Sequence, residues 1–396
     1  MSVATPLPRT IRPRPAPPAA VSQDRFDPYS AYVGGGKPTP TGGLTEIQSQ
    51  ERLHLSPLWN SLLGTVAVAI SKTGFGIEYV GKKLGLFSSL GSIQKPLPPS
   101  RLTDLPAYKL ERPIVLVPGF QTPKNRFEHI VDKLTADGLN GGAAYYVKDG
   151  EFYTDIDCTR QTEPSHPPAA PQGDPVGRDA KVFVAVFHST QDVPTETAPQ
   201  LDATLKTIRQ FTGATKVDAV GYSMGGLATR AYLDHGGEDV GRFSMVGTPN
   251  QGSALSQLSM WLLDLKAEGR GVDWLVSRKP LSEADRPALQ WLRPVDSPNP
   301  NSALLDLNSR VDAQNRQAEQ VLSMGSKARY TSDPHVKPVH GDGTVPASSL
   351  ELPNTEVMTL SGKVFGNHGL LLSNPEVYQG LAGFFHWTPV EAGGKP

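Results

Sequence analysis

The stretch Lys216–Tyr232, KVDAVGYSMGGLATRAY, is the part of the sequence from which the fold is predicted most directly. Its first residues form a short apolar run typical of a buried strand, and apolar residues recur at helical spacing after Gly226. Ser223 lies between these two parts. A sharp turn from strand to helix crowds its central residue, so the small neighbours Gly221 and Gly225 favour such a turn. The stretch therefore predicts a strand, a tight turn and a helix, with one serine at the apex.

The pattern Gly221-x-Ser223-x-Gly225 is short, and glycine fills 39 of the 396 positions. The pattern alone therefore does not separate a catalytic turn from a glycine-rich structural turn. The strand before it, the helix after it and suitable partner residues further along the chain favour a nucleophilic serine.

Composition and charge limit the classes of function. With 38% hydrophobic residues the chain can bury a large core, and we expect a soluble globular protein. Its 38 Lys and Arg against 39 Asp and Glu do not favour binding to nucleic acid or to an anionic membrane. The single cysteine, Cys158, cannot form an intrachain disulfide, and no cluster of His, Cys and Asp has metal-ligand spacing. We therefore expect no cofactor, no metal and no nucleic-acid partner.

The N-terminal sequence lacks the pattern of a secretory signal, because Arg9, Arg12 and Arg14 are not followed by an apolar segment of sufficient length. The longest apolar run, residues 62–70, is too short to cross a bilayer. We expect cytoplasmic residence without a transmembrane segment, and leave export by a non-classical route open. The sequence does not determine the oligomeric state.

We divide the chain into three regions. Residues 1–50 are rich in Pro, Gly, Ser and Thr, which predicts a flexible leader. Residues 51–105 predict an apolar helical extension and a linker. Within them an amphipathic helix at 77–87 either packs on the next domain or lets the 55–87 region contact a lipid surface. Residues 106–390 form the main domain.

The main domain alternates between predicted strands and helices. Its first strand is apolar at every position, as in a parallel sheet covered on both faces. The predicted strands are 113–117, 182–187, 217–220, 242–246, 328–331 and 356–360, and the first two predicted helices are 125–139 and 201–211. The part between the first helix and residue 177 is interpreted as an irregular insertion. This order predicts an α/β class with a mostly parallel, doubly wound sheet flanked by helices.

A helical insertion is predicted at about 253–307. It contains a leucine stripe at helical spacing and three tryptophans: Leu255, Leu258, Leu262, Leu265, Trp261, Trp274 and Trp291. A cover over an apolar pocket and a plain core helix both account for this pattern.

A serine hydroxyl becomes a good nucleophile only when a base takes its proton, and the base needs an acid that fixes its tautomer. Asp342 and His368 each lie in a loop after a predicted strand. They follow Ser223 in the order expected for a strand–turn–helix nucleophile. We predict Ser223 as the nucleophile, Asp342 as the acid and His368 as the base.

Other side chains compete for these roles. His368 is favoured among the nine histidines because it lies in the loop after the final sheet strand, just before a helix start at Asn374–Pro375. His188, which ends a strand, is the competitor least easily dismissed. Glu356 and Asp333 are weaker candidates for the acid.

Backbone amides are the usual donors to the oxyanion of a tetrahedral intermediate. Met224 follows the serine and starts a helix whose dipole supports its amide. The second donor should lie in the loop after the first apolar strand, where Phe120 is our choice and Gln121 the next. A simple turn that ends the strand is the alternative.

Five segments together resemble bacterial lipases and esterases of the α/β-hydrolase superfamily, triacylglycerol lipases among them. The segments are LVPGF (116–120), GYSMGG (221–226), GTPNQGS (247–253), GDGTVP (341–346) and NHG (367–369). The resemblance covers roughly residues 113–385 and implies an α/β-hydrolase fold with a helical lid insertion at 253–307. Many relatives have His-Gly where this chain has Pro118-Gly119.

The resemblance implies a serine hydrolase that cleaves lipid-like carboxylic esters through an acyl-enzyme on Ser223. It assigns Asp342 and His368 as acid and base, and Phe120 and Met224 as oxyanion donors. It implies no cofactor, and a structural cation, which some relatives hold, is left open. An acyltransferase, thioesterase or phospholipid deacylase on the same residues is the alternative. A non-catalytic binding module with this fold is a second alternative.

Overall fold

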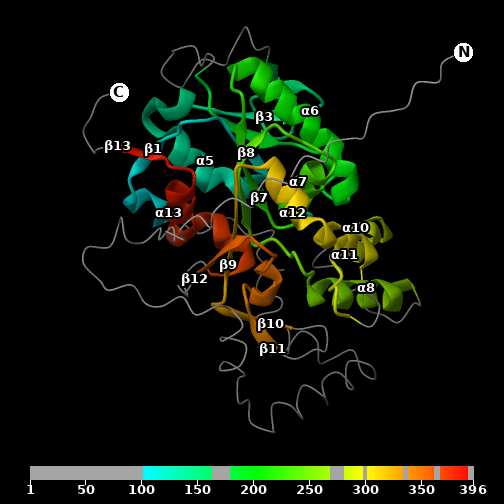
Figure 1. Ribbon diagram of the computed structural model, residues 1–396. Coiled ribbons are helices and arrows are strands. Elements are labelled where there is room, and N and C mark those ends of the chain that lie inside the picture. The colour runs from blue at the N-terminus through cyan, green and yellow to red at the C-terminus, as the bar shows by residue number, and fades with distance from the viewer. Residues whose placement is uncertain are drawn as a thin grey trace, which may run out of the picture. The chain divides into compact units, whose positions relative to one another are not determined.

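The computed structural model describes residues 101–162, 179–267, 281–297, 301–332, 338–360 and 366–390. At its centre is a nine-stranded sheet (Figure 1). The strands are β2 (Ile114–Val117), β3 (Ala144–Lys148), β4 (Glu151–Tyr153), β5 (Gln161–Thr162), β6 (Val182–Ala185), β7 (Val217–Tyr222), β8 (Val240–Val246), β9 (Gln320–Ser326) and β12 (Glu356–Leu360). Their spatial order is β12-β9-β8-β7-β2-β6-β3-β4-β5. All pairs from β12 to β3 are parallel, whereas β4 and β5 add an antiparallel edge.

Helices cover both faces of this sheet (Figure 1). They are α5 (Glu128–Thr135) and α13 (Pro375–Phe384) on one face, and α6 (Pro194–Thr212) and α7 (Met224–Asp234) on the other. Along β2, Ile114 and Leu116 pack toward α5 and α13, while Val115 and Val117 pack toward α6 and α7. A strand buried on both faces needs an apolar side chain at each position, which explains the run IVLV. The mostly parallel sheet between helices confirms the predicted fold class.

The predicted irregular insertion after α5 is wrong for its first part. Residues 144–162 contain β3, β4 and β5, and β3 pairs with β6 in the parallel sheet. Asp149 and Gly150, with φ of 52° and 81°, turn β3 into β4. An Asp-Gly pair between alternating apolar residues is typical of a two-residue hairpin turn.

The predicted sheet strand at 328–331 is also wrong. The sheet strand is β9, which ends before that range. The following residues form β10 (Arg329–Ser332), which pairs with β11 (Pro338–Gly341) in a separate two-stranded sheet. Small and polar residues such as Ser323 interrupt β9, so it lacks the continuous apolar run that is typical of a buried strand.

The helical insertion lies between β8 and β9. It contains α8 (Ala254–Ala267), α10 (Arg286–Trp291), α11 (Ser302–Ser309) and α12 (Val311–Gln317), and so extends beyond the predicted end at 307. Leu255 of the predicted stripe is buried. The side chains of Leu258, Trp261, Leu262, Leu265 and Trp274 lie outside what the structure describes.

The predicted leader and the predicted amphipathic helix at 77–87 lie outside the described residues. Near the start of the described chain, Arg101–Asp104 form a short 3₁₀ helix, η2. Its Leu102 side chain is buried in the core beside α13. Strand β1 (Ala107–Lys109) pairs with β13 (Thr388–Val390) and joins the start of the described chain to its end.

Candidate active site

Ser223 lies at the turn between β7 and α7. Its φ of 55° and ψ of −129° place it in a region that residues with side chains rarely adopt, at a cost of about 1–3 kcal/mol. Gly221 makes this turn possible, since a Cβ there would lie 2.5 Å from the Cα of Gly226. The strand and the helix therefore approach closely, and the Ser223 hydroxyl is held at the carboxyl edge of the sheet.

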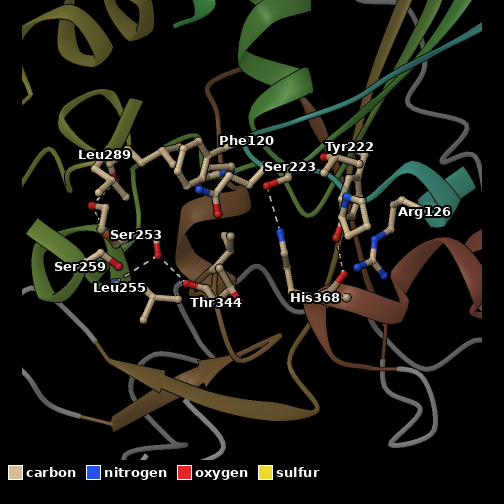
Figure 2. Close-up of a pocket in the computed structure, with 18 of the residues that line it drawn as sticks. Phe120, Arg126, Tyr222, Ser223, Ser253, Leu255, Ser259, Leu289, Thr344 and His368 are labelled. Carbon is tan, nitrogen blue, oxygen red and sulfur yellow. Dashed lines mark hydrogen bonds between the residues drawn. The ribbon is translucent and has the colours of Figure 1, made fainter. Parts of the chain in front are cut away.

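His368 is placed beside this serine by the loop after β12. Its Nε2 lies 2.9 Å from Ser223 Oγ (Figure 2). Tyr222 holds His368 in two ways: its hydroxyl donates to the His368 carbonyl oxygen at 2.8 Å, and the two ring centroids are 5.3 Å apart. Burial raises the pKa of Tyr222 to about 12, so the hydroxyl keeps the proton that it donates.

Asp342 holds the other ring nitrogen of His368, with 2.7 Å between Oδ2 and Nδ1. Its Oδ1 accepts the backbone N–H groups of Thr344 and Val345 at 2.9 and 2.7 Å. The side chain is buried. Because a carboxylate can only accept, His368 Nδ1 carries the proton, and Nε2 is free to accept the proton of Ser223.

The structure therefore brings together Ser223, His368 and Asp342 from three separate loops at one edge of the sheet. A hydroxyl, an imidazole in this tautomer and a carboxylate in series can transfer the hydroxyl proton to the imidazole while the oxygen attacks an electrophile. The arrangement has the geometry of an activated nucleophile.

The loop after β2, residues 118–123, lies against the turn that carries Ser223. A Cβ on Gly119 would lie 2.7 Å from the backbone nitrogen of Met224. Thr122 fixes the loop, because its Oγ1 accepts the N–H of Gly119 and donates to the Gly119 carbonyl oxygen, both at 2.9 Å. Glycine is required at 119 by this close approach.

The amides of this loop differ in their availability. The N–H of Gln121 donates to the carbonyl oxygen of Thr190 at 2.9 Å and is therefore occupied. The Phe120 amide makes no hydrogen bond to any residue in the described part of the chain. Met224 is the first residue of α7, so its N–H has no acceptor within the helix. Phe120 and Met224, rather than Gln121, have amides that can donate to a ligand.

A cavity of about 100 Å³ opens at Ser223. Five apolar side chains line part of it: Phe120, Leu255, Leu281, Leu289 and Leu292. Four of the five belong to the helical insertion. Phe120 packs against two buried clusters, one of insertion residues and one in which insertion residues pack with Met224 and Leu227 of α7. The insertion therefore forms the apolar wall of the cavity.

The competing candidates lie elsewhere. His188 contacts Asp149 on the surface, with 2.5 Å between Nε2 and Oδ1 and both side chains more than half exposed. Glu356 is exposed at the start of β12. Asp333 lies outside the described residues. Cys158 is a free, partly buried thiol.

Three residues that shape the site were not predicted: Thr122, Tyr222 and Asp285. The first two lie next to predicted residues in the sequence, and that adjacency was the available signal. Asp285 gave no signal, because its contacts connect distant parts of the chain.

Asp285 links the insertion to the loop that carries Phe120. It ends a short 3₁₀ helix, η5 (Glu283–Asp285), and is fully buried. Its Oδ1 accepts the Nε2 groups of Gln121 and Gln191, each at 2.7 Å. Its Oδ2 accepts the N–H of Ser282 at 2.7 Å. A buried carboxylate with all of these donors holds Gln121, and with it the neighbouring Phe120 amide, in place.

Two further properties concern only the residues that the structure describes. Within them, no group of His, Cys, Asp and Glu side chains is arranged to hold a metal ion. No helix in the same ranges has the length and apolarity needed to cross a membrane.

The mostly parallel sheet, the serine at the turn after β7, and the acid and histidine after later strands define an α/β-hydrolase fold. No protein-family model matches the chain. A stretch of 84 residues, 21% of the chain, is 38% identical to triacylglycerol lipases of Pseudarthrobacter phenanthrenivorans and Burkholderia plantarii. The match spans 26% and 24% of those proteins, about a quarter of their length. This local likeness confirms the predicted resemblance to bacterial lipases.

Solved structures with a similar fold include the lipase BlEst2 of Bacillus licheniformis in its mature form and a metagenomic carboxyl esterase, MGS0156. The first has a TM-score of 0.42 and 17% identity, over 74% of this chain and 96% of that one. The second has a TM-score of 0.38 and 14% identity, over 74% of this chain and 79% of that one.

Replacing Asp285 with Asn should slow the reaction of Ser223 with a fluorophosphonate about fivefold, the equivalent of one hydrogen bond of about 1 kcal/mol. The amide keeps the size of the carboxylate but cannot accept all of its donors, so Gln121 and the Phe120 amide lose their fixed position. The measurement is the second-order rate constant of labelling, together with the melting temperature.

Glu283→Gln is the matched control, since Glu283 lies in the same short helix but is exposed and pairs with Arg286. It should label at the wild-type rate. If Asp285→Asn also labelled at the wild-type rate while its melting temperature fell, Asp285 would stabilise the insertion without positioning the loop.

Proposed function

We propose that this chain is a serine hydrolase that cleaves carboxylic esters, in particular lipid-like esters, through an acyl-enzyme on Ser223. The observation that carries the proposal is the pair of hydrogen bonds that link Ser223 to His368 and His368 to Asp342. The apolar cavity at the serine and the local likeness to proteins named triacylglycerol lipase support it.

In the first half of the reaction, Ser223 Oγ attacks the ester carbonyl carbon while His368 Nε2 takes the hydroxyl proton. The carbonyl oxygen becomes negative and accepts the N–H groups of Phe120 and Met224. The Asp342 carboxylate stabilises the imidazolium. The intermediate then breaks its bond to the alcohol oxygen, and the alcohol leaves with the proton that His368 returns.

In the second half, water attacks the acyl carbon, and His368 takes a proton from that water. The new tetrahedral intermediate breaks its bond to Ser223 Oγ, which regains its proton from His368, and the carboxylic acid leaves. An alcohol acceptor in place of water would make the same acyl-enzyme an acyltransferase. Hydrolysis is proposed because water needs no further binding site.

The apolar wall favours an alkyl chain on the acyl side. Each methylene that moves from water into an apolar site contributes about 0.8 kcal/mol, or about fourfold in binding. Specificity should therefore rise with acyl length until the cavity beside Leu255 and Leu289 is filled.

Ser223→Ala should abolish labelling by an active-site-directed fluorophosphonate and lower kcat/KM for 4-nitrophenyl octanoate by at least about 10⁴-fold, because the nucleophile is lost. Ser259→Ala is the matched control, since Ser259 also lines the cavity and should leave labelling intact. The assay is labelling followed by intact-protein mass spectrometry. Labelling that persisted in Ser223→Ala would place the nucleophile elsewhere.

The apolar wall predicts that kcat/KM rises from 4-nitrophenyl acetate to the octanoate. Leu289→Trp should reduce the octanoate-to-acetate ratio at least about fivefold, because the larger ring fills space that the acyl chain would occupy. Leu305→Trp is the control: Leu305 is 42% exposed on α11 and should leave the ratio unchanged. A steep wild-type preference for acetate would contradict the lipid-like substrate class.

A further inference from the structure

The cavity at Ser223 contains a positive charge that the proposed reaction does not use. Arg126, in the 3₁₀ helix η3 (Lys124–Phe127), lines the cavity together with Ser223 and His368. None of the described residues that line the cavity is Asp or Glu. Among these described lining residues, the Arg126 guanidinium is therefore the permanent charge, and none of them carries a carboxylate that could neutralise it.

Arg126 is buried, with 3% of its surface exposed. Its Nε and Nη1 atoms are inaccessible to solvent and make no hydrogen bond to any residue that the structure describes. The same part of the chain provides no ion pair for it. A guanidinium at this depth is normally paired, since removing a charge from water is costly without a partner. An unpaired buried donor therefore indicates a ligand with acceptor groups.

Arg126 is nevertheless held in a defined place. Its guanidinium carbon lies 5.8 Å from the centroid of the Tyr222 ring, in a cation–π contact. The Tyr222 ring also contacts the His368 ring, and the two ring centroids are 5.3 Å apart. The charge is thus positioned one ring away from the base.

Arg126 and the apolar wall lie at different parts of the same cavity. Figure 2 shows Arg126 beside Tyr222 and His368, whereas Leu289 and Ser259 lie on the other side of Ser223. An ester whose carbonyl carbon lies at Ser223 and whose acyl chain lies on the leucines directs its alcohol part toward Arg126.

We propose that Arg126 binds an anionic oxygen group, a phosphate or a carboxylate, on the alcohol part of the substrate. The inference rests on the proposed esterase function and names its substrate class: esters of acidic alcohols. A guanidinium matches both groups in geometry and charge, and the interaction is stronger in a cavity than on an open surface. Its role is distinct from that of the Phe120 and Met224 amides, which face the reacting carbonyl oxygen.

The test compares three octanoate esters with the same acyl chain, each below the concentration at which it forms micelles. They are 1-octanoylglycerol, which is neutral, 1-octanoylglycerol 3-phosphate and 3-(octanoyloxy)propanoate. For the wild type we expect kcat/KM for at least one anionic ester to exceed that for the neutral ester at least about tenfold, as a charge-assisted hydrogen bond would give. The phosphate and carboxylate esters decide which anion the site takes.

In Arg126→Gln the ratio of anionic to neutral kcat/KM should fall to about one. Arg126→Lys keeps the charge without the planar fork and should retain part of the ratio. Lys124→Gln is the matched control, because Lys124 lies in the same short helix with 68% of its side chain exposed and should keep the wild-type ratio. Each ratio is taken within one variant, so it does not depend on the amount of folded protein.

A wild type that hydrolyses the neutral ester and prefers neither anionic ester overturns the role of Arg126 and leaves the proposed esterase function intact. An anionic preference that survives Arg126→Gln also overturns it. If the wild type hydrolyses none of the three esters, the proposed function and this inference both fail.

Discussion

The hydrogen bond between Ser223 and His368 is the interaction on which the site depends, because it joins residues 145 positions apart in the chain. The two can meet only because β7 and β12 run in the same direction and end at the same edge of the sheet, with β8 and β9 between them. Asp342 reaches the same edge through the hairpin that follows β9. The parallel sheet, made rigid by a core on both faces, therefore fixes the distances over which a proton can move.

Several features that lower stability are found around this one edge. Ser223 has a strained backbone, and Asp342 and Asp285 are buried carboxylates. Arg126 is a buried cation whose Nε and Nη1 make no hydrogen bond to any described residue. Natural sequences depart from local rules mainly at functional sites, where binding or catalysis compensates for the lost stability. The strands β2 and β6 follow those rules, with buried apolar side chains at every position. This contrast distinguishes the apolar core strands from the edge of the sheet that we propose binds the ligand.

The sequence was sufficient for the features that local patterns encode. The turn at Ser223 requires small neighbours within two residues, and the order of Asp342 and His368 after it is a property of the chain alone. The strand β9 was missed because small and polar residues interrupt it, and β3 to β5 were missed because a short hairpin was interpreted as a loop. Asp285 and Arg126 could not be predicted, since their importance comes from burial and from contacts, or missing contacts, with residues far along the chain.

The most direct test of the site is a double-mutant cycle on the residues that share the first proton. The kcat/KM for 4-nitrophenyl octanoate is measured for Ser223→Ala, His368→Ala and the double variant. If the hydroxyl and the imidazole act as one unit, either single change removes the same proton transfer, and the double variant should be within about threefold of the slower single variant. Losses that multiply in the double variant would show that the two side chains act independently, and would contradict the proposed mechanism.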